Sequence, residues 1–343
     1  DIAEFSTARV SSVKLDCKNY VSTENMLQDF QGVVEAKSVP NETNVISFTC
    51  GDILISNIRP YLKKVWKATF DGGCSSDVFV LQATDTVAKD YLHYAVANDK
   101  FINYVMSGAK GVKMPRGDKN QMRTYQLSLP SIQEQYKIAK LLTLLDERIA
   151  TQSKLIEKLE SLIKGLRVSL MQIENGNIVH LGEIARIYQP QTISSTELTE
   201  DGFLVYGANG IIGKYKEYNH KTEQICITCR GNTCGMVNYT KPMSWITGNA
   251  MVINTDEHQN KVCKRYLYHY LSAYNFNSII SGSGQPQIVR TPLEKLEITL
   301  PSIFEQEQKA MLLDRIQAKI EISNRVLSLY QEQKQYLLRQ MFI

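Results

Sequence analysis

Two long stretches of the chain carry hydrophobic residues at alternating intervals of four and three positions. The first stretch runs from residue 138 to 170 and the second from 313 to 341. This spacing predicts two helices, each about 40 residues and about 60 Å long, that bury one face along a coiled-coil seam. The seam positions that we assign to the helix pair are Ile138, Leu142, Leu145, Ile149, Ile156, Leu159, Ile163, Leu166, Leu313, Ile316, Ile320, Leu327, Tyr330 and Leu337.

Polar residues interrupt both seams. Gln152 and Ser323 stand at the same level of their helices, and Lys334 is a further flaw in the second seam. A polar seam residue either fixes the register of paired helices or is a tolerated surface position, and the sequence leaves both readings open. Equal length and matched register favour pairing within one molecule over dimerisation with a second chain or packing of each helix on its own globular segment.

The sequence contains an internal repeat, because the same short motif precedes both helical stretches. Leu-Pro-Ser-Ile-Gln-Glu-Gln at 129–135 returns as Leu-Pro-Ser-Ile-Phe-Glu-Gln at 300–306, an offset of 171 residues. In both copies a serine precedes a glutamate by three positions, which is the arrangement of a helix capping box. A weaker echo opens each half, at 1–4 and at 183–186. The Leu-Gly before the second echo has no counterpart before Asp1, so we expect the natural protein to start some residues earlier.

The remaining residues predict an α+β fold with two strand-rich globular segments. We expect a globular segment over 1–129, a helical one over 130–173, a second globular segment over 174–299 and a second helical one over 300–343. The expected strands are Val45–Ile58, Val78–Leu81, Gln224–Thr228 and Ala250–Ile253. In each half a tyrosine-containing helix follows, at 91–94 in the first and at 266–270 in the second. A Gly/Ser loop comes after each helix, at 107–111 and at 281–284. Two modules with the same order of elements but different side chains suggest two different short targets.

Composition narrows the class of protein. The chain has 343 residues, 43% of them hydrophobic and 22% charged, which excludes a disordered, collagen-like or disulfide-rich chain. No run of about 20 apolar residues could form a membrane helix, and the first residues lack the features of a signal peptide. The seven cysteines are odd in number and scattered, which favours a reducing cytoplasm over a disulfide framework.

Charge is concentrated rather than spread evenly. The net charge is +4, and the window from residue 107 to 123 alone carries five basic residues against one acid. Basic residues on loops suit phosphate contact, whereas Arg, Asn and Gln suit the edges of bases. A solvated surface role is the alternative for any single residue, but the cluster at 110–123 favours nucleic-acid contact. The candidate DNA contacts are Arg59, Lys63, Lys64, Lys110, Lys113, Arg116, Lys119, Arg123, Lys214, Lys216, Arg230, Asn232, Gln285, Gln287 and Arg290.

Three apparent chemical motifs fail. Residues 207–214 mimic a phosphate-binding loop, but Ala208 replaces a required glycine and Tyr215 stands where Ser or Thr should bind magnesium. Cys226 and Cys229 would lie on opposite faces of a strand, so they are expected to be core thiols rather than zinc ligands. No arrangement of histidines, nucleophiles or carboxylates has the spacing of a catalytic site. We therefore expect no catalytic residues and no metal site.

These segments resemble one known family, the specificity (S) subunits of type I restriction–modification systems, known as HsdS. The likeness is carried by the duplicated Leu-Pro-Ser-Ile-x-Glu-Gln helices and by Gly-Asp-Ile-Leu-Ile-Ser-Asn-Ile-Arg-Pro at 51–60. It is also carried by Tyr-Gly-Ala-Asn-Gly-Ile-Ile-Gly at 206–213 and by the loops at 113–117 and 285–288.

The resemblance implies a non-catalytic DNA reader. In that family two target recognition domains alternate with two helical regions, which pack antiparallel as a spacer and give the subunit a pseudo-two-fold axis. Each domain reads one half of a bipartite, asymmetric site on double-stranded DNA. The helices set the spacing and dock two modification (M) subunits, which bind S-adenosylmethionine and methylate a flipped adenine. Restriction (R) subunits add cleavage driven by ATP and Mg²⁺, so this chain is expected to bind no cofactor itself.

Two other functions remain open at the level of the residues. A coiled-coil scaffold or adaptor without DNA reading would explain the helices but not the basic cluster. A self-sufficient nuclease or methyltransferase would need catalytic motifs that the sequence does not show.

Overall fold

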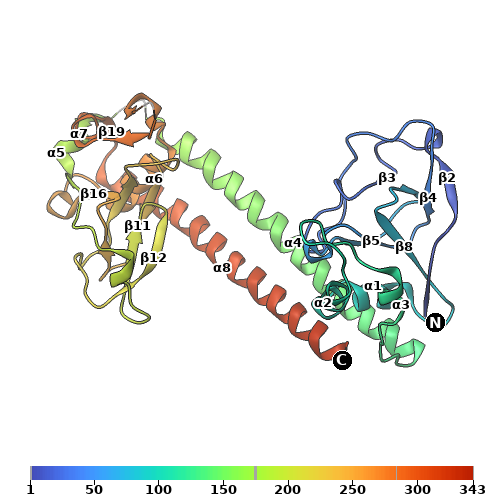
Figure 1. The fold of residues 1–343 in the computed structure, drawn as a ribbon. Helices are drawn as coiled ribbons and strands as arrows, with labels where there is room; N and C mark the ends of the chain where they lie inside the picture. Colours follow the sequence, from blue (N-terminus) through green and yellow to red (C-terminus); the bar gives the residue numbers. More distant parts are fainter. Residues whose placement is uncertain (1, 174–175, 283, 343) are drawn as a thin grey trace. The chain divides into compact units, whose positions relative to one another are not determined.

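The computed structural model describes residues 2–173, 176–282 and 284–342 (Figure 1). The chain forms two compact units. The first consists of Asp1–Ser153 with Val326–Ile343, and the second is Lys154–Arg325. Each unit therefore contains one strand-rich module and parts of both long helices, α4 (Ile132–Met171) and α8 (Ile303–Met341).

The module of the first unit is built on a four-stranded antiparallel sheet. Its strand order is β1-β8-β5-β6, where β1 is Ala3–Phe5, β8 is Val78–Ala83, β5 is Ile53–Ser56 and β6 is Val65–Lys67. Helices α1 (Lys89–Val96) and α2 (Asp99–Ser107) pack on this sheet and bury its hydrophobic residues. A second small sheet has the order β2-β4-β7-β3, with β2 at Arg9–Ser11, β4 at Asn44–Phe48, β7 at Gly72–Cys74 and β3 at Tyr20–Val21.

The module of the second unit repeats the main sheet. The order is β10-β16-β13-β14, where β10 is Arg186–Tyr188, β16 is Ala250–Asn254, β13 is Ile225–Thr228 and β14 is Val237–Tyr239. Even the register is shared: Ile53 pairs with Lys67 in the first module, and Ile225 pairs with Tyr239 in the second, both 172 positions later. The internal repeat seen in the sequence is thus also a repeat of topology. Helix α6 (Lys264–Ala273) takes the place of α1.

The second module also has elements of its own. A three-stranded sheet has the order β12-β11-β15, with β12 at Gly210–Tyr215, β11 at Phe203–Gly207 and β15 at Trp245–Ile246. Strand β9 (Asn177–His180) pairs with β19 (Glu297–Leu300), and β9 leads into the short helix α5 (Leu181–Ile184). No helix within the described residues is long and apolar enough to cross a membrane.

One strand prediction was wrong. The continuous strand expected over 45–58 is two strands, β4 and β5, separated by a turn. The turn forms because the Asp52 carboxylate accepts a hydrogen bond from the Thr49 N–H at 2.9 Å, while Gly51 takes a φ of +91° that other residues rarely adopt. The expected strands at 78–81, 224–228 and 250–253 and the two tyrosine-containing helices are confirmed, apart from Gln224, which precedes β13.

The two long helices pair in each unit. In the first unit the start of α4 lies beside the end of α8, since Asp146 forms an ion pair with Lys334 and Arg148 lies over the Tyr330 ring. In the second unit the end of α4 packs with the start of α8 around the buried Ile163, Leu313 and Ile320. The partly buried residues that pack against them are Leu159, Leu166, Leu170, Met171 and Ile316. The helices are therefore antiparallel partners within one molecule, as the matched seams indicated. The Lys334 flaw is explained by its half-buried acidic partner, Asp146.

Each helix start is fixed to its own module by one glutamine of the repeated signal. The Ser131 and Ser302 hydroxyls accept hydrogen bonds from the N–H groups of residues 134 and 305, as expected for helix caps. The buried Gln135 then accepts a hydrogen bond from the Ala88 N–H at 2.8 Å and donates to two carbonyls, of Thr86 at 3.4 Å and Pro130 at 3.0 Å. Gln306 makes the same three bonds in its own unit, from the Cys263 N–H at 2.9 Å and to the carbonyls of Lys261 at 3.2 Å and Pro301 at 2.9 Å.

Candidate nucleic-acid interface

The basic cluster of the first module forms a small hairpin, which we call the first hairpin (residues 110–116). Lys110 and Arg116 exchange both backbone hydrogen bonds, at 3.0 and 2.9 Å. The turn between them requires glycine, because Gly111 has a φ of +96° and a Cβ there would meet the Met114 carbonyl at 3.2 Å. The exposed loop therefore connects two strand-like residues, Lys110 and Arg116, that are hydrogen-bonded to each other.

The second module carries an equivalent structure, the second hairpin (residues 281–287), 171 positions later. Strands β17 (Ile280–Ser281) and β18 (Gln287–Ile288) pair so that Ser281 faces Gln287. Gly282 has a φ of +94°, and a Cβ there would lie 2.4 Å from the Gln285 carbonyl. Of the loops expected at 107–111 and 281–284, residues 110–111, 281–282 and 284 lie in matching hairpins. Ser107 is instead the last residue of α2, and residue 283 lies outside the described residues.

The same backbone bonds attach both hairpins to the end of the central strand of each main sheet. In the first module the Arg59 N–H donates to the Pro115 carbonyl at 2.8 Å, and the Gly117 N–H donates to the Asn57 carbonyl at 3.0 Å. In the second module the donors are the N–H groups of Gly231 and Ile288, and the acceptors are the carbonyls of Pro286 and Cys229, both at 3.0 Å. A short helix follows each hairpin, α3 (Lys119–Arg123) in the first and α7 (Arg290–Glu294) in the second.

The structure separates the basic residues of the first module into free and occupied ones. Arg59 and Lys113 are exposed, and their side chains form no hydrogen bond or ion pair within the described residues. Lys110 forms an ion pair with Asp118 at 3.1 Å, and Arg116 approaches Asp77 only to 3.8 Å. The remaining predicted contacts have other partners: Lys63 with Asp99, Lys64 with the Thr23 carbonyl, Lys119 with the Phe5 and Phe79 rings, and Arg123 with the Phe5 ring.

Lys64 shows how a bond to the protein changes the pKa and the availability of a lysine side chain. Its ammonium donates to the Thr23 carbonyl at 2.6 Å in a half-buried position. Burial, and then the nearby Arg59 charge, lower the pKa of Lys64. A lysine held in this way is less available to a phosphate than the exposed Lys113.

In the second module three of the predicted contacts come together. Arg230, Gln287 and Arg290 line a hollow of about 330 Å³ beside the second hairpin, and residues 230 and 287 form a backbone bridge. Arg290 forms an ion pair with Glu294 at 2.7 Å. The exposed Gln189, which sequence reasoning missed, lines the same hollow from the chain after β10. Its only signal was its place after the second echo of the repeat.

The other predicted contacts of this module lie apart from the hollow or on its rim. Asn232 and Gln285 are exposed in the loops beside it. Lys214 and Lys216 lie at β12, which Figure 1 shows at the other end of this unit from α7. Lys214 lies 3.6 Å from Asp201, and Lys216 stands over the Tyr215 ring. The structure therefore does not join these two lysines to the hairpin cluster.

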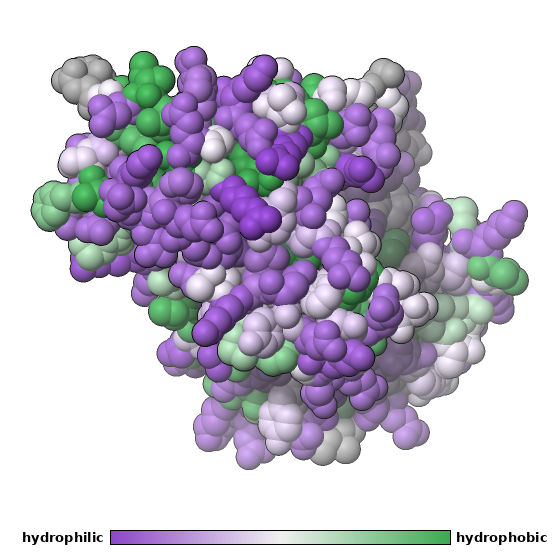
Figure 2. Space-filling view, turned by 90° about the vertical axis from the view of Figure 1, so that its left-hand side faces the viewer, coloured by the Kyte–Doolittle hydropathy of each residue, from purple (hydrophilic) through white to green (hydrophobic). Residues whose placement is uncertain are grey.

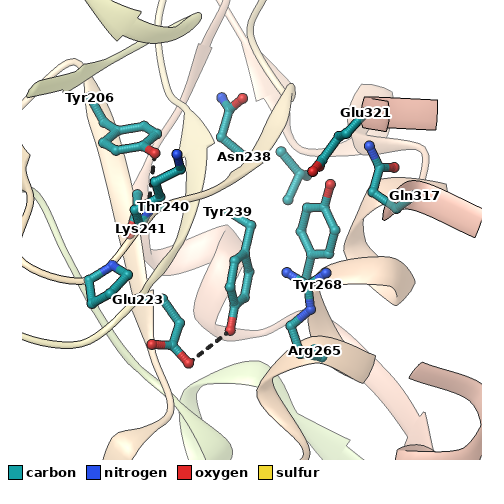
Figure 3. A pocket seen from close by; sticks show the side chains of 12 residues that line it. Tyr206, Glu223, Asn238, Tyr239, Thr240, Lys241, Arg265, Tyr268, Gln317 and Glu321 are labelled. Carbon is teal, nitrogen blue, oxygen red and sulfur yellow. Dashed lines mark hydrogen bonds between the residues drawn. The ribbon is translucent and has the colours of Figure 1, made fainter. Parts of the chain in front are cut away.

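A larger hollow in the second unit, of about 640 Å³, lies between β14, α6 and α8 (Figure 3). Its central base, Arg265, is bonded to the Asp314 carboxylate and lies over the rings of Tyr239 at 4.2 Å and Tyr268 at 5.3 Å. The Tyr239 hydroxyl donates to the Glu223 carboxylate at 3.4 Å. Because the base is neutralised and an acid lines the wall, this hollow does not suit a phosphate backbone, and none of the predicted DNA contacts lines it.

A buried histidine links α6 to both long helices in this unit. The Arg167 Nε donates to Nδ1 of His269 at 3.2 Å, so the ring hydrogen lies on Nε2, which donates to Asp314 at 2.8 Å. Burial lowers the pKa of His269, although the Asp314 bond opposes the shift. In the first unit, Tyr94 of α1 takes the equivalent role, and its hydroxyl donates to Asp146 of α4 at 2.8 Å.

The rejected motifs are structural. Residues 207–214 belong to the β11–β12 hairpin rather than to a loop that opens a helix, so they cannot form a phosphate-binding loop. Cys226 and Cys229 are buried in two different hydrophobic clusters, which confirms them as core thiols. The described part of the chain holds no group of three or more metal-binding side chains.

The face of the molecule seen in Figure 2 is largely hydrophilic, with hydrophobic residues in small, separate groups. Such a surface offers no broad apolar patch.

Comparison with known proteins gives one consistent family. The family model described as type I restriction modification DNA specificity domain matches residues 5–161 and again residues 174–329. The EcoprrI specificity subunit of Escherichia coli is 33% identical over 140 residues, which cover 39% of this chain and 34% of that protein. The MjaVIII specificity subunit of Methanocaldococcus jannaschii is 24% identical over 301 residues, 74% of this chain and 69% of that protein.

A solved structure agrees with the sequence comparisons. The S subunit of a type I restriction–modification system from M. genitalium has a TM-score of 0.68 at 16% identity, and the match covers 98% of this chain and 96% of that one. This likeness shows a shared fold. Since the two matches to the family model take in most of the sequence, the chain belongs to the family of type I restriction–modification DNA specificity domains.

Proposed function

We propose that this chain is the non-catalytic DNA-reading subunit of a type I restriction–modification complex. Each module reads one half of a bipartite, asymmetric site on double-stranded DNA. The observation that carries this proposal is the pair of hairpins, held by the same backbone bonds but bearing different polar side chains. Equivalent scaffolds with different reading groups are what two unlike half-sites require.

The polar groups around each hairpin match the two parts of DNA binding. Exposed charges such as Lys113 suit phosphates, whose neutralisation gives affinity without sequence information. Arg116 and Gln287, at the base of the hairpins, have the forked side chains that read base edges in the major groove. Lys214 and Lys216 stay candidate phosphate contacts outside the hairpins.

The long helices act as the spacer in this proposal. Residues 1–129 and 174–299 are the target recognition domains, and 130–173 and 300–343 hold them apart. The fixed starts at Gln135 and Gln306 support a rigid attachment of each domain to its helix. The length of this helical spacer sets the number of unspecified base pairs between the two half-sites.

The outer faces of the helices are the proposed docking surface for two modification subunits. Large hydrophobic side chains stay exposed there, away from the seam, and exposed apolar groups mark protein contacts. They include Tyr136, Leu141, Leu144, Leu329 and Tyr336 in the first unit, and Leu155, Leu162, Phe304, Met311, Leu312 and Ile322 in the second. In the assembled system, S-adenosylmethionine belongs to the modification subunits, and ATP and Mg²⁺ belong to the restriction subunits.

The test is a reconstitution of the full chain with its modification subunits on DNA of random sequence. Sequencing of the methylated adenines should show two short specified blocks, separated by a fixed number of unspecified base pairs. Methylation without sequence preference would refute the reading function and favour a scaffold. Methyl transfer by the purified chain alone would instead make it an enzyme.

A further inference from the structure

We propose that residues 116 and 287 are equivalent base-reading positions, with Arg116 reading a guanine in one half-site and Gln287 an adenine in the other. This inference rests on the proposed DNA-reading function and gives it two specific residues. It follows from the equivalence of the two hairpins and from the state of the side chains that they carry.

The two residues occupy the same place in the same backbone. Each closes its hairpin by pairing with a residue six positions earlier, Lys110 or Ser281. Each also forms a bridge to the second residue after the central strand, Ile58 in the first module and Arg230 in the second. The hairpin strand that carries 116 or 287 is therefore held on both sides.

A held backbone makes these positions suitable for reading bases. A side chain on a fixed Cα loses less conformational freedom on binding than one at a loop tip. The neighbouring prolines 115 and 286 fix the chain further, since each accepts a clamping hydrogen bond and cannot rotate about φ. Residues 113 and 285 lie in the loops above, where contact with phosphates needs less precise placement.

Neither side-chain head forms a hydrogen bond with the protein within the described residues. The Arg116 guanidinium forms only a long ion pair with Asp77, whose distance of 3.8 Å exceeds hydrogen-bonding range. The Gln287 amide likewise has no hydrogen-bond partner there and faces the hollow that Arg230 and Arg290 line. Lys110 and Arg290 form closer ion pairs, with Asp118 at 3.1 Å and with Glu294 at 2.7 Å.

The chemistry of the two heads assigns the bases. An arginine fork donates two parallel hydrogen bonds to O6 and N7 of guanine, whereas a glutamine amide donates to N7 and accepts from N6 of adenine. Each such pair discriminates against a wrong base by about 1–3 kcal/mol, or roughly 5- to 150-fold in preference. A swap of the two residue types should therefore change one base preference in each half-site.

The experiment uses the reconstituted complex of the full chain with its modification subunits and a random-sequence DNA library. We expect Arg116→Gln to change the preferred base at one position of one half-site and to leave the other half-site as in the wild type. Gln287→Arg should do the reverse. Lys113→Gln is the matched control from the same hairpin, and it should weaken methylation of all sites about equally, without changing the sequence read.

Arg116→Lys separates base reading from simple charge. It keeps the positive charge but loses the fork, so affinity for DNA without the guanine should stay nearly the same, while the preference for guanine falls at least about fivefold. A wild-type preference at that position would show that the guanidinium fork does not read the base, and would overturn the inference. An unchanged motif in both swaps, or a change in both half-sites from one swap, would overturn it as well.

The failure of the inference and the failure of the proposed function give different results. If the wild-type complex methylates without preference, the reading function itself fails. If the wild type is selective and the variants read the same sequence, only the assignment of residues 116 and 287 fails. Thermal unfolding of each variant, which should match the wild type because both side chains lack protein hydrogen bonds, shows that any change comes from recognition.

Discussion

Replacement of Gln135 or Gln306 by methionine should loosen one long helix from its module. Methionine has a similar length and volume but cannot form the three hydrogen bonds of the amide. The loss leaves one N–H and one carbonyl without a partner in the buried part of each junction, while the third group, the carbonyl of Thr86 or Lys261, belongs to an exposed residue and can be hydrated. At about 1–2 kcal/mol for each unpaired buried group, each variant should lose about 2–4 kcal/mol of unfolding free energy.

The two tryptophans of the chain allow each unit to be followed separately. Trp66 lies in the first unit and Trp245 in the second, and both are buried, so their fluorescence reports unfolding of their own unit. In a Trp245→Phe background, urea unfolding reads the first unit, where Gln135→Met should act. In a Trp66→Phe background it reads the second unit, where Gln306→Met should act.

Gln133 supplies the matched control, because it lies two residues before Gln135 and is exposed. Gln133→Met should change the unfolding free energy by less than about 0.5 kcal/mol. The reasoning would be refuted if either buried-glutamine variant cost less than about 1 kcal/mol. It would also be refuted if each variant destabilised both units equally, since its hydrogen bonds lie within one.

Three further predictions concern charge, strain and pH. Arg59 has a left-handed φ of 56° at the position where the second module has Gly231, so Arg59→Gly should leave the protein equally stable, or up to about 1 kcal/mol more stable, in thermal unfolding. The DNA affinity of the complex should nevertheless fall. Equal affinity would show that Arg59 makes no contact with DNA. The double variant Lys110→Gln with Lys113→Gln should reduce the slope of log affinity against log salt by up to about 1.8, and an unchanged slope would exclude both as phosphate contacts. The lowered pKa of the buried His269 means that the unfolded chain takes up its proton first, so stability falls as pH drops below about 6.5. His269→Gln should make that fall shallower in urea titrations between pH 7 and 5, and an unchanged pH dependence would show that His269 does not contribute.

Sequence periodicity predicted the helices well because their physics is local and repetitive. A 4,3 spacing can only be satisfied by a helix that buries one side, and two matched spacings in one chain can bury each other. The capping serines and the glutamine signal fixed where the helices begin. The flaw at Lys334 was visible, but its acidic partner Asp146 lies 188 positions earlier, and no local rule connects them.

The candidate site was only partly visible because its organisation is made by backbone hydrogen bonds. The first hairpin, Lys-Gly-Val-Lys-Met-Pro-Arg, and the second, Ser-Gly-Ser-Gly-Gln-Pro-Gln, share only a glycine and a proline in register. Their common clamp depends on N–H and carbonyl groups, which every residue except proline carries. Sequence reasoning found the polar residues but could not show which were occupied, such as Lys63 by Asp99, or that Gln189 completes the hollow.

The repeat itself shows how such a protein can change what it reads without losing its fold. Where a side chain forms the contact, as Gln135 and Gln306 do, both copies carry the same residue, because a different one would leave buried groups unpaired. Where the backbone forms the contact, as at Arg116 and Gln287, the copies differ, because the backbone hydrogen bonds that hold the hairpin do not depend on the side chain. If the proposed base reading holds, substitution there should alter recognition at little cost in stability. The division between backbone clamp and free side chain therefore separates folding from specificity, and it predicts that other changes of specificity will be tolerated at these same two positions.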